Sequence, residues 1–382
     1  MSAHDIAVLG AGSVGVPIAL SLAEAGQSVI CIDSAPSPGQ GNNKCAIGGI
    51  RATHSEPAKV AICLDSIEIF SGWKDLHGDD IEWRQGGYTY VAYDEPTASL
   101  LRGMVPAQKA SGLGIDFVTP EAITALVRGI RRDGLIGGTY SPGDGSASPM
   151  RSCHAFYARA RSLGVDFRFG ETVTALDASD SSISSVRTDK GAYAAGCFVN
   201  CCGSQAADVG RLVGLDLPIF PDCHEAGVTE PVERFMEPMV VDIRKAPGSA
   251  NYYFFQFATG QIVFCITPDP PIPGTSVSET SEFLPMVAPR MVALLPRLAN
   301  IKVRRTWRGS YPQTPDGSPI VGRAGPENHL LAVGMCGQGF MLGPGAGRLV
   351  ARLITESLTE RDRETLEALR LDRNFGAEEA LK

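Results

Sequence analysis

A glycine-rich turn near the start of the chain constrains the fold more than any other feature. Gly10, Gly12 and Gly15 stand between the apolar run 6–9, which indicates a buried strand, and the stretch 14–22, whose apolar residues recur at helical spacing. In a strand–turn–helix unit the first glycine allows the tight turn, the second lets the backbone approach a pyrophosphate, and the third lets helix and strand pack. Free N–H groups at the helix start attract phosphate. The pattern predicts a dinucleotide-binding unit; the alternative is a glycine turn that binds nothing.

An acidic residue ends the second predicted strand. That strand is expected over residues 28–32, and Asp33 follows it. A carboxylate in this place can bind the ribose diol of a dinucleotide and disfavours the 2′-phosphate of NADP, while an aspartate that only caps a turn is the alternative. This part of the chain gives four expected cofactor contacts: Gly10, Gly12, Gly15 and Asp33.

Two further glycine-rich segments favour FAD over NAD. Residues 202–203 follow a predicted strand at 197–200, and residues 337–345 precede a predicted helix at 345–358. An NAD enzyme needs only one contiguous nucleotide domain, whereas a helix N-terminus aimed at a flavin would stabilise negative charge on the reduced ring. Glycine makes up 43 of 382 residues, or 11%, against a usual ~7%, as expected where backbone lies close to a ligand. An NAD-dependent dehydrogenase is the alternative, and it would be colourless when purified.

Composition and charge exclude several classes of protein. Hydrophobic residues make up 44% and charged residues 20%, which is typical of a soluble globular chain. The formal net charge is −8, and no run of Lys or Arg indicates a nucleic-acid or lipid surface. No stretch approaches 18 consecutive apolar residues, so no membrane span is expected. The ten cysteines form no C-x-x-C pair, so we expect buried thiols and no metal site. Because residues 1–10 carry neither a basic region nor a cleavage site, we expect a cytoplasmic protein.

The order of the predicted elements indicates an α/β protein of two interleaved domains. A discontinuous Rossmann-like FAD-binding domain is expected, with an inserted α+β substrate domain that contains a mostly antiparallel sheet. The predicted strands of that sheet are 229–232, 239–243, 252–257 and 261–266. The predicted boundaries are 1–85, 143–217 and 312–382 for the FAD-binding domain, and 86–142 and 218–311 for the substrate domain.

Taken together, these motifs resemble the D-amino-acid oxidase superfamily of FAD-dependent oxidoreductases over nearly the whole chain. Within it the chain resembles the branch of beta subunits of sarcosine oxidase, dye-linked proline dehydrogenase and hydrogen cyanide synthase. No single motif is decisive, but their order and spacing together are specific. The segments that carry the resemblance are residues 10–15 with Asp33, Ile47–Arg51, Asp144–Pro149, Val199–Gly203, Thr314–Gly322 and Gly337–Gly345.

The resemblance implies a flavoprotein whose isoalloxazine ring lies at the interface of two domains. It implies oxidation of a secondary amine or amino acid, such as sarcosine, proline or an N-alkyl amino acid, by hydride transfer to flavin N5, which leaves an imine that hydrolyses. Beta subunits of this branch act beside other chains, so partner subunits that carry electrons or a second site are also implied. The rival hypothesis is a flavin-bearing assembly subunit that catalyses nothing.

The resemblance also extends the set of expected FAD contacts. Val173 matches the family's adenine-facing backbone position, and Cys202 and Gln338 lie within matching segments. Neither a histidine nor a cysteine matches the linkage position of members with covalent flavin, so non-covalent FAD is expected. The added contacts are Ser13, Val14, Ser34, Asn42, Asn43, Gly48, Gly49, Val173, Cys202, Gly203, Gly337, Gln338, Gly339, Phe340 and Met341.

Five residues are candidates for binding or converting the substrate. Arg51 matches an arginine that grips the substrate carboxylate in sarcosine oxidases, although it could instead pair with protein carboxylates. His54 is expected near the ring or held by backbone groups. Tyr252 and Gln256, like the neighbouring Tyr253, lie on the predicted sheet that roofs the site, where aromatic residues more often pack. Gln338 stands where the family often has a histidine. Tyr311 stands where glycine and D-amino-acid oxidases often have an arginine, as in the sarcosine oxidase beta-subunit branch.

Overall fold

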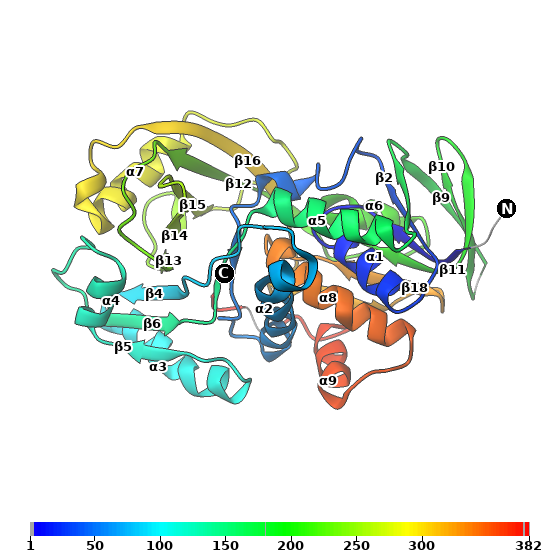
Figure 1. Ribbon diagram of the computed structural model, residues 1–382, viewed down its shortest axis with the longest axis horizontal. Helices are drawn as coiled ribbons and strands as arrows, with labels where there is room; N and C mark the ends of the chain where they lie inside the picture. The colour runs from blue at the N-terminus through cyan, green and yellow to red at the C-terminus, as the bar shows by residue number, and fades with distance from the viewer. Residues whose placement is uncertain (1–3, 180, 377–378, 382) are drawn as a thin grey trace.

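Two eight-stranded sheets define the architecture of the computed structural model, which describes residues 4–179, 181–376 and 379–381 (Figure 1). The first sheet has the order β17-β18-β11-β1-β2-β8, with the hairpin β9–β10 continuing from β11. Its four central pairings are parallel, and β17–β18 is antiparallel. The strands are β1 (His4–Leu9), β2 (Val29–Asp33), β8 (Asp166–Phe169), β9 (Val173–Ala178), β10 (Ile183–Thr188), β11 (Ala192–Asn200), β17 (Ile320–Arg323) and β18 (His329–Val333).

The second sheet is antiparallel except for the pair β13–β4, and its order is β16-β12-β15-β14-β13-β4-β6-β5. A small two-stranded sheet, β3–β7, lies between the two. The strands are β3 (Gly49–Ile50), β4 (Tyr88–Ala92), β5 (Asp116–Val118), β6 (Gly137–Ser141), β7 (Gly145–Ser146), β12 (Phe220–Thr229), β13 (Met239–Asp242), β14 (Ser249–Gln256), β15 (Ile262–Pro268) and β16 (Val303–Gln313).

Helices cover one face of the first sheet, as expected for parallel strands buried on both faces. Alternate residues of β1 enter two cores: Ile6 and Val8 pack with the helices, and Ala7 and Leu9 pack with the β9–β10 hairpin. Helices α3, α4 and α7 instead contact strands of the second sheet. Over the whole described chain, the helices are α1 (Gly15–Glu24), α2 (Pro57–His77), α3 (Glu95–Ala110), α4 (Pro120–Leu126), α5 (Pro149–Ser162), α6 (Ala206–Arg211), α7 (Phe283–Leu294), α8 (Gly339–Ile354) and α9 (Glu360–Leu369), with 3₁₀ turns η1 (Asn42–Cys45), η2 (Gly203–Gln205) and η3 (Pro296–Leu298).

The fold class predicted from the sequence is confirmed, but several elements differ. Helix α8 begins six residues before the predicted start at 345, because its glycines select close helix packing rather than a loop. A Cβ on Gly343 would collide with the Ser13 carbonyl in the turn before α1, and one on Gly345 with the Ile62 carbonyl in α2. The α8 N-terminus is thereby fixed beside the glycine turn.

Two strands of the second sheet escaped the sequence pattern. The predicted strand 229–232 is wrong: β12 ends at Thr229, and β16 was not predicted at all. Both strands carry polar side chains among the apolar ones, such as Asp222, His224 and Arg308, which hide the alternation expected of a half-buried strand. The second sheet draws its strands from residues 88–141 and 220–313, and the predicted domain boundaries remain predictions.

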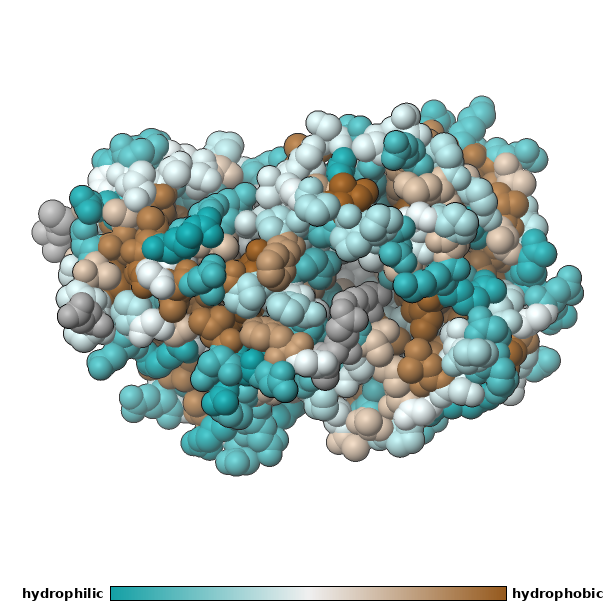
Figure 2. Space-filling view, turned by 180° about the vertical axis from the view of Figure 1, so that it is seen from behind, coloured by the Kyte–Doolittle hydropathy of each residue, from teal (hydrophilic) through white to brown (hydrophobic). Residues whose placement is uncertain are grey.

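Each eight-stranded sheet and the helices packed on it form one lobe of the molecule, called the first and second lobe after their sheets. Seen from behind, the surface is mostly polar or mixed with scattered apolar patches, and the outline narrows between the two lobes (Figure 2). Among the described residues, no helix combines the length and apolar character needed to cross a membrane. After α9 the chain returns to the middle of the molecule, where residues 379–381 contact the loop after β3 (Figure 1).

Candidate active site

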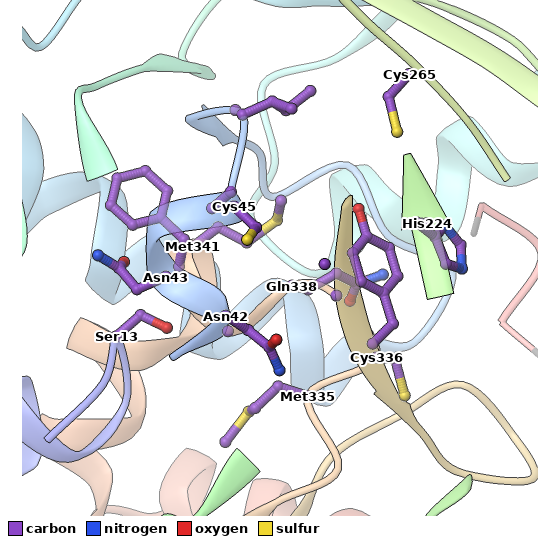
Figure 3. A pocket seen from close by; sticks show the side chains of 18 of the residues that line it. Ser13, Asn42, Asn43, Cys45, His224, Cys265, Met335, Cys336, Gln338 and Met341 are labelled. Atoms are coloured by element: carbon purple, nitrogen blue, oxygen red, sulfur yellow. The ribbon is translucent and has the colours of Figure 1, made fainter. Parts of the chain in front are cut away.

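A cavity lies where the two sheets meet, and both contribute to its wall. On one side are the turn before α1, η1, β3 and the start of α8; on the other are β4, β12, β13, β14 and β16. Figure 3 shows Asn42, Cys45 and Met341 on one side of this space, with His224 and Cys265 across from them. The cavity thus joins the predicted dinucleotide turn to the second sheet.

The fold requires two of the three glycines of the first turn, Gly10 and Gly15, but not Gly12. Gly10 has φ +101°, and a Cβ there would lie 2.7 Å from the carbonyl oxygen of Cys201. A Cβ on Gly15 would collide with the Gly10 carbonyl. A Cβ on Gly12 would meet nothing within 4 Å, so the fold itself does not require glycine there. This is the behaviour expected of a position kept open for a pyrophosphate.

The acidic residue at the end of β2 is held by the same turn. Asp33 accepts hydrogen bonds from the N–H groups of Ala11 at 2.6 Å and Ala35 at 2.7 Å. These contacts fix the carboxylate beside the glycine turn, where its role toward a ribose remains a prediction. Ser34 is exposed next to it, Val173 begins β9, and the Cys202 thiol donates to the Leu9 carbonyl. Seven predicted cofactor residues are outside the described cavity wall: Gly10, Gly12, Gly15, Asp33, Ser34, Val173 and Cys202.

Polar atoms in the wall fit a nucleotide cofactor. Asn42 is locked between the two lobes, since it donates to the Ser204 hydroxyl at 2.9 Å and accepts from the Ser310 N–H at 3.2 Å. The side-chain oxygens of Asn43 and Gln338 are buried with no protein partner among the described residues. An unsatisfied buried acceptor typically costs about 1–3 kcal/mol, so a donor from a bound group suits both. Figure 3 shows both side chains at the cavity.

The start of α8 forms another part of this wall. Gly339, Phe340 and Met341 occupy the first turn of the helix, whose N–H groups have no partners within the helix. Gly48, Gly49, Gly203 and Gly337 also line the cavity. Most of the predicted cofactor residues are therefore brought together: Gly48, Gly49, Asn42, Asn43, Ser13, Val14, Gly203, Gly337, Gln338, Gly339, Phe340 and Met341.

An aromatic group faces them from the second sheet. The hydroxyls of Tyr253 and Tyr311 lie 3.1 Å apart, and the Tyr311 ring stacks on His224 with centroids 3.8 Å apart. Burial, followed by the field of Cys265, raises the pKa of Tyr311 above its usual value, so the phenol stays neutral. The sequence placed Tyr253 on the sheet expected to roof the site and marked Tyr311 only as a departure from the wider family, while His224 was not predicted.

The His224 ring is oriented by a carboxylate. Its Nε2 lies 2.8 Å from Asp222, so this nitrogen carries the proton, and Nδ1 is a buried acceptor without a partner in the described part of the chain. His224 lines the cavity. The pair therefore places one unpaired acceptor, His224 Nδ1, on a residue of the cavity wall.

Arg51 reaches the same cavity from the end of β3. It is 5% exposed; Nη1 donates to the Thr53 carbonyl and lies 3.1 Å from His54 Nδ1, and Nη2 donates to the Leu381 carbonyl at 2.6 Å. Burial alone would lower the pKa of Arg51, but Tyr90 and Glu379 raise it, so the guanidinium is charged. His54 is wholly buried behind Arg51; burial and the charges of Arg51 and Lys59 hold its pKa well below the usual value.

Three predicted catalytic residues do not line the cavity: His54, which is buried behind Arg51, Tyr252 and Gln256. The Tyr252 side chain points into the core of the second lobe and stacks on Phe254. Gln256 is bound by the backbone, accepting from the Phe235 N–H and donating to carbonyls that include Gly260. Successive residues of a strand face opposite sides of a sheet, and the phase of β14 turns Tyr253 rather than Tyr252 toward the cavity.

Fold and cavity together define a two-lobed dinucleotide-binding oxidoreductase. A family model described as FAD dependent oxidoreductase (DAO) matches residues 5–353. The chain therefore belongs to this family of FAD-dependent oxidoreductases.

Individual relatives agree with this assignment. The chain is 25% identical to mitochondrial dimethylglycine dehydrogenase of Rattus norvegicus over 367 residues, which cover 91% of this chain and 42% of that protein. Glycine oxidase of Bacillus subtilis is 24% identical and is covered, like this chain, over 97% of its length. The crystal structure of L-proline dehydrogenase from P. horikoshii superimposes with a TM-score of 0.90 at 29% identity, over 98% of this chain and 99% of that one. The chain thus spans less than half of the dehydrogenase from rat.

We predict that Gly12→Val abolishes FAD retention without unfolding the apoprotein. Two methyl groups and a Cβ would enter space that no protein atom needs but a pyrophosphate does. Flavin content after gel filtration and the thermal unfolding of the apoprotein are the two measurements. An apoprotein that melts far below wild type, or a variant that keeps its FAD, would contradict this.

We further predict that acid precipitation releases the flavin into the supernatant. The side chain to test for a covalent bond to the flavin is Cys45, because its thiol lines the cavity and is only partly buried. Burial raises its pKa, which disfavours the thiolate needed to form a thioether. Colour that stays in the pellet of wild type but leaves the pellet of Cys45→Ser would show a covalent bond instead.

Proposed function

We propose that this protein oxidises a secondary amine or amino acid of the sarcosine, proline or N-alkyl amino acid type with FAD as cofactor. The observation that carries the proposal is the buried, charged Arg51 in the wall of the cavity, across from an aromatic group on the other sheet. Bound FAD supplies an acceptor for the hydride on the carbon beside the amine. Gly10, Gly12, Gly15, Asp33, Asn43 and the start of α8 would hold it.

The remaining steps fall to side chains of this chain. Arg51 binds the substrate carboxylate through a charge-assisted bond, since a guanidinium suits carboxylate geometry. Tyr253, Tyr311 and His224 form the opposite wall and exclude water from the amine. Amine oxidation requires the unprotonated amine, and His224 Nδ1 accepts that proton while Asp222 stabilises the resulting imidazolium.

The relatives support a substrate of this class. Among them are proteins named dimethylglycine dehydrogenase, glycine oxidase and L-proline dehydrogenase, whose names all specify amino acids. Likeness to the proline dehydrogenase over nearly the full length of both chains, with Tyr311 and Gln338 as its departures from the wider family, supports the beta-subunit branch. In that role the protein works in the cytoplasm beside partner subunits that carry electrons away.

We predict that an N-methyl or cyclic amino acid bleaches the flavin absorption of the purified protein under anaerobic conditions. A screen of sarcosine, dimethylglycine, proline and glycine against the same concentrations of unmodified amines identifies the substrate. The yellow colour should be stable without substrate. A flavin that dithionite reduces but that no amine in the screen bleaches would favour an assembly subunit over an enzyme.

We predict that Arg51→Lys weakens binding of the amino acid far more than binding of FAD. An ammonium keeps the charge but cannot reproduce the planar fork, and losing such a pair typically costs about 2–4 kcal/mol, or ~30- to 1,000-fold in affinity. The exposed Arg161→Lys on α5 is the matched control. The measurement compares the amino acid with its carboxamide; an equal affinity change for both ligands would show that Arg51 does not bind the carboxylate.

A further inference from the structure

A short segment far along the chain reaches the candidate substrate site from behind. The backbone carbonyl of Leu381 accepts a hydrogen bond from Arg51 Nη2 at 2.6 Å. The Leu381 side chain is 1% exposed and packs in the cluster that contains Tyr88, Tyr90 and Val241. These three residues also line the cavity. Leu381 therefore touches both the guanidinium and the wall of the site.

Glu379 fixes this segment to the cofactor-binding lobe. One carboxylate oxygen accepts from the Ser55 N–H at 2.8 Å and the Ser55 hydroxyl at 2.5 Å, and the other lies 3.0 Å from Lys59 Nζ. The Glu379 N–H donates to the Asp316 carbonyl at 2.9 Å. Glu379 therefore anchors both Ser55, in the loop after Arg51, and the backbone N–H of Leu381, which donates to the Glu379 carboxylate at 3.1 Å.

The ion pair makes this anchor hard to release. Lys59 is fully buried, and its other contact is a hydrogen bond to the Gly317 carbonyl at 3.1 Å. Burial lowers the pKa of Lys59, and Glu379 opposes that shift. Burial would raise the pKa of Glu379, but the charges of Lys59 and Arg51 hold it well below its usual range. Moving Glu379 away would leave a buried ammonium without its partner, which is strongly unfavourable.

We propose that residues 379–381 are a positioning element of the substrate site. Glu379, held by Lys59 and Ser55, places the Leu381 carbonyl against Arg51; this carbonyl and that of Thr53 fix the plane of the guanidinium in the cavity wall. A guanidinium held in one plane binds a carboxylate with less loss of conformational freedom. The proposal rests on the proposed role of Arg51 in carboxylate binding.

The burial of the segment favours a fixed wall over a displaceable plug. Glu379 is 4% exposed and Leu381 is 1% exposed, and their contacts come from both lobes. A plug that substrate displaces would have to break the Lys59 ion pair on every turnover. The segment therefore raises affinity for a carboxylate ligand instead of competing with it.

Two variants test the element at its two anchors. Glu379→Gln removes the charge that holds Lys59, and Leu381→Ala removes the apolar anchor of the carbonyl. The ligand is the amino acid that bleaches the flavin in the anaerobic screen. In the FAD-loaded protein, each substitution should raise the KM for this amino acid by about 10- to 100-fold, as expected for a misplaced binding group. The KM of the carboxamide analogue and the FAD content should stay within about twofold of wild type. Glu364→Gln and Leu212→Ala, both exposed, are the matched controls.

The outcomes separate this proposal from the one on which it rests. A selective rise in KM for the carboxylate ligand supports the positioning role. Equal losses for both ligands, no change, or tighter carboxylate binding overturn it. If either single variant fails to retain FAD, Lys59→Met/Glu379→Gln, which removes both buried charges together, is measured in the same way and decides by the same criterion. If Arg51→Lys shows no carboxylate selectivity, the proposed function fails first, whatever the segment does.

Discussion

The site depends on the direct backbone contact of α8 with the glycine turn and with α2. At Gly343 and Gly345 no side chain larger than hydrogen fits, because carbonyl oxygens of Ser13 and Ile62 occupy the space. This contact places the N-terminus of α8 beside the N-terminus of α1, so two helix dipoles point their positive ends at one cavity. A dinucleotide carries negative charge at its pyrophosphate, and a reduced flavin carries it on its ring, so the arrangement suits both parts.

The two lobes contribute different chemistry to the cavity. The first provides the glycine turn, η1, Arg51 and the start of α8, while the second provides tyrosines and His224 from strands of its sheet. Asn42 ties the two together through Ser204 and Ser310. In the proposed function, a substrate bound at this junction would contact both lobes, its carboxylate at Arg51 in the first and its amine at the second.

The sequence predicted the parts of the fold that follow simple physical rules. The first two strands with their glycine turn were recognisable because buried parallel strands are continuous apolar runs. β12 and β16 were missed because polar side chains that line the cavity or contact a neighbouring loop interrupt the alternation of apolar and polar residues. The sequence could not show which of Tyr252 and Tyr253 faces the cavity, because the pairing with neighbouring strands decides which side chains lie on each face of the sheet. The contact of Leu381 with Arg51 spans 330 positions and leaves no local signal.

The charges around Arg51 also bear on the type of ligand. Arg51 and Lys59 are the cations of this buried cluster, and Glu379 and Asp144 face them from separate segments. Burial raises the pKa of Asp144 to about 6 although Ala52 and Thr53 donate to it, so it is ionised at neutral pH. The described cluster is thus balanced before any ligand binds. A zwitterionic amino acid adds no net charge to it, whereas a simple amine or a simple acid would leave an uncompensated charge in a poorly hydrated site. This charge balance supports the proposed amino-acid substrate over either alternative.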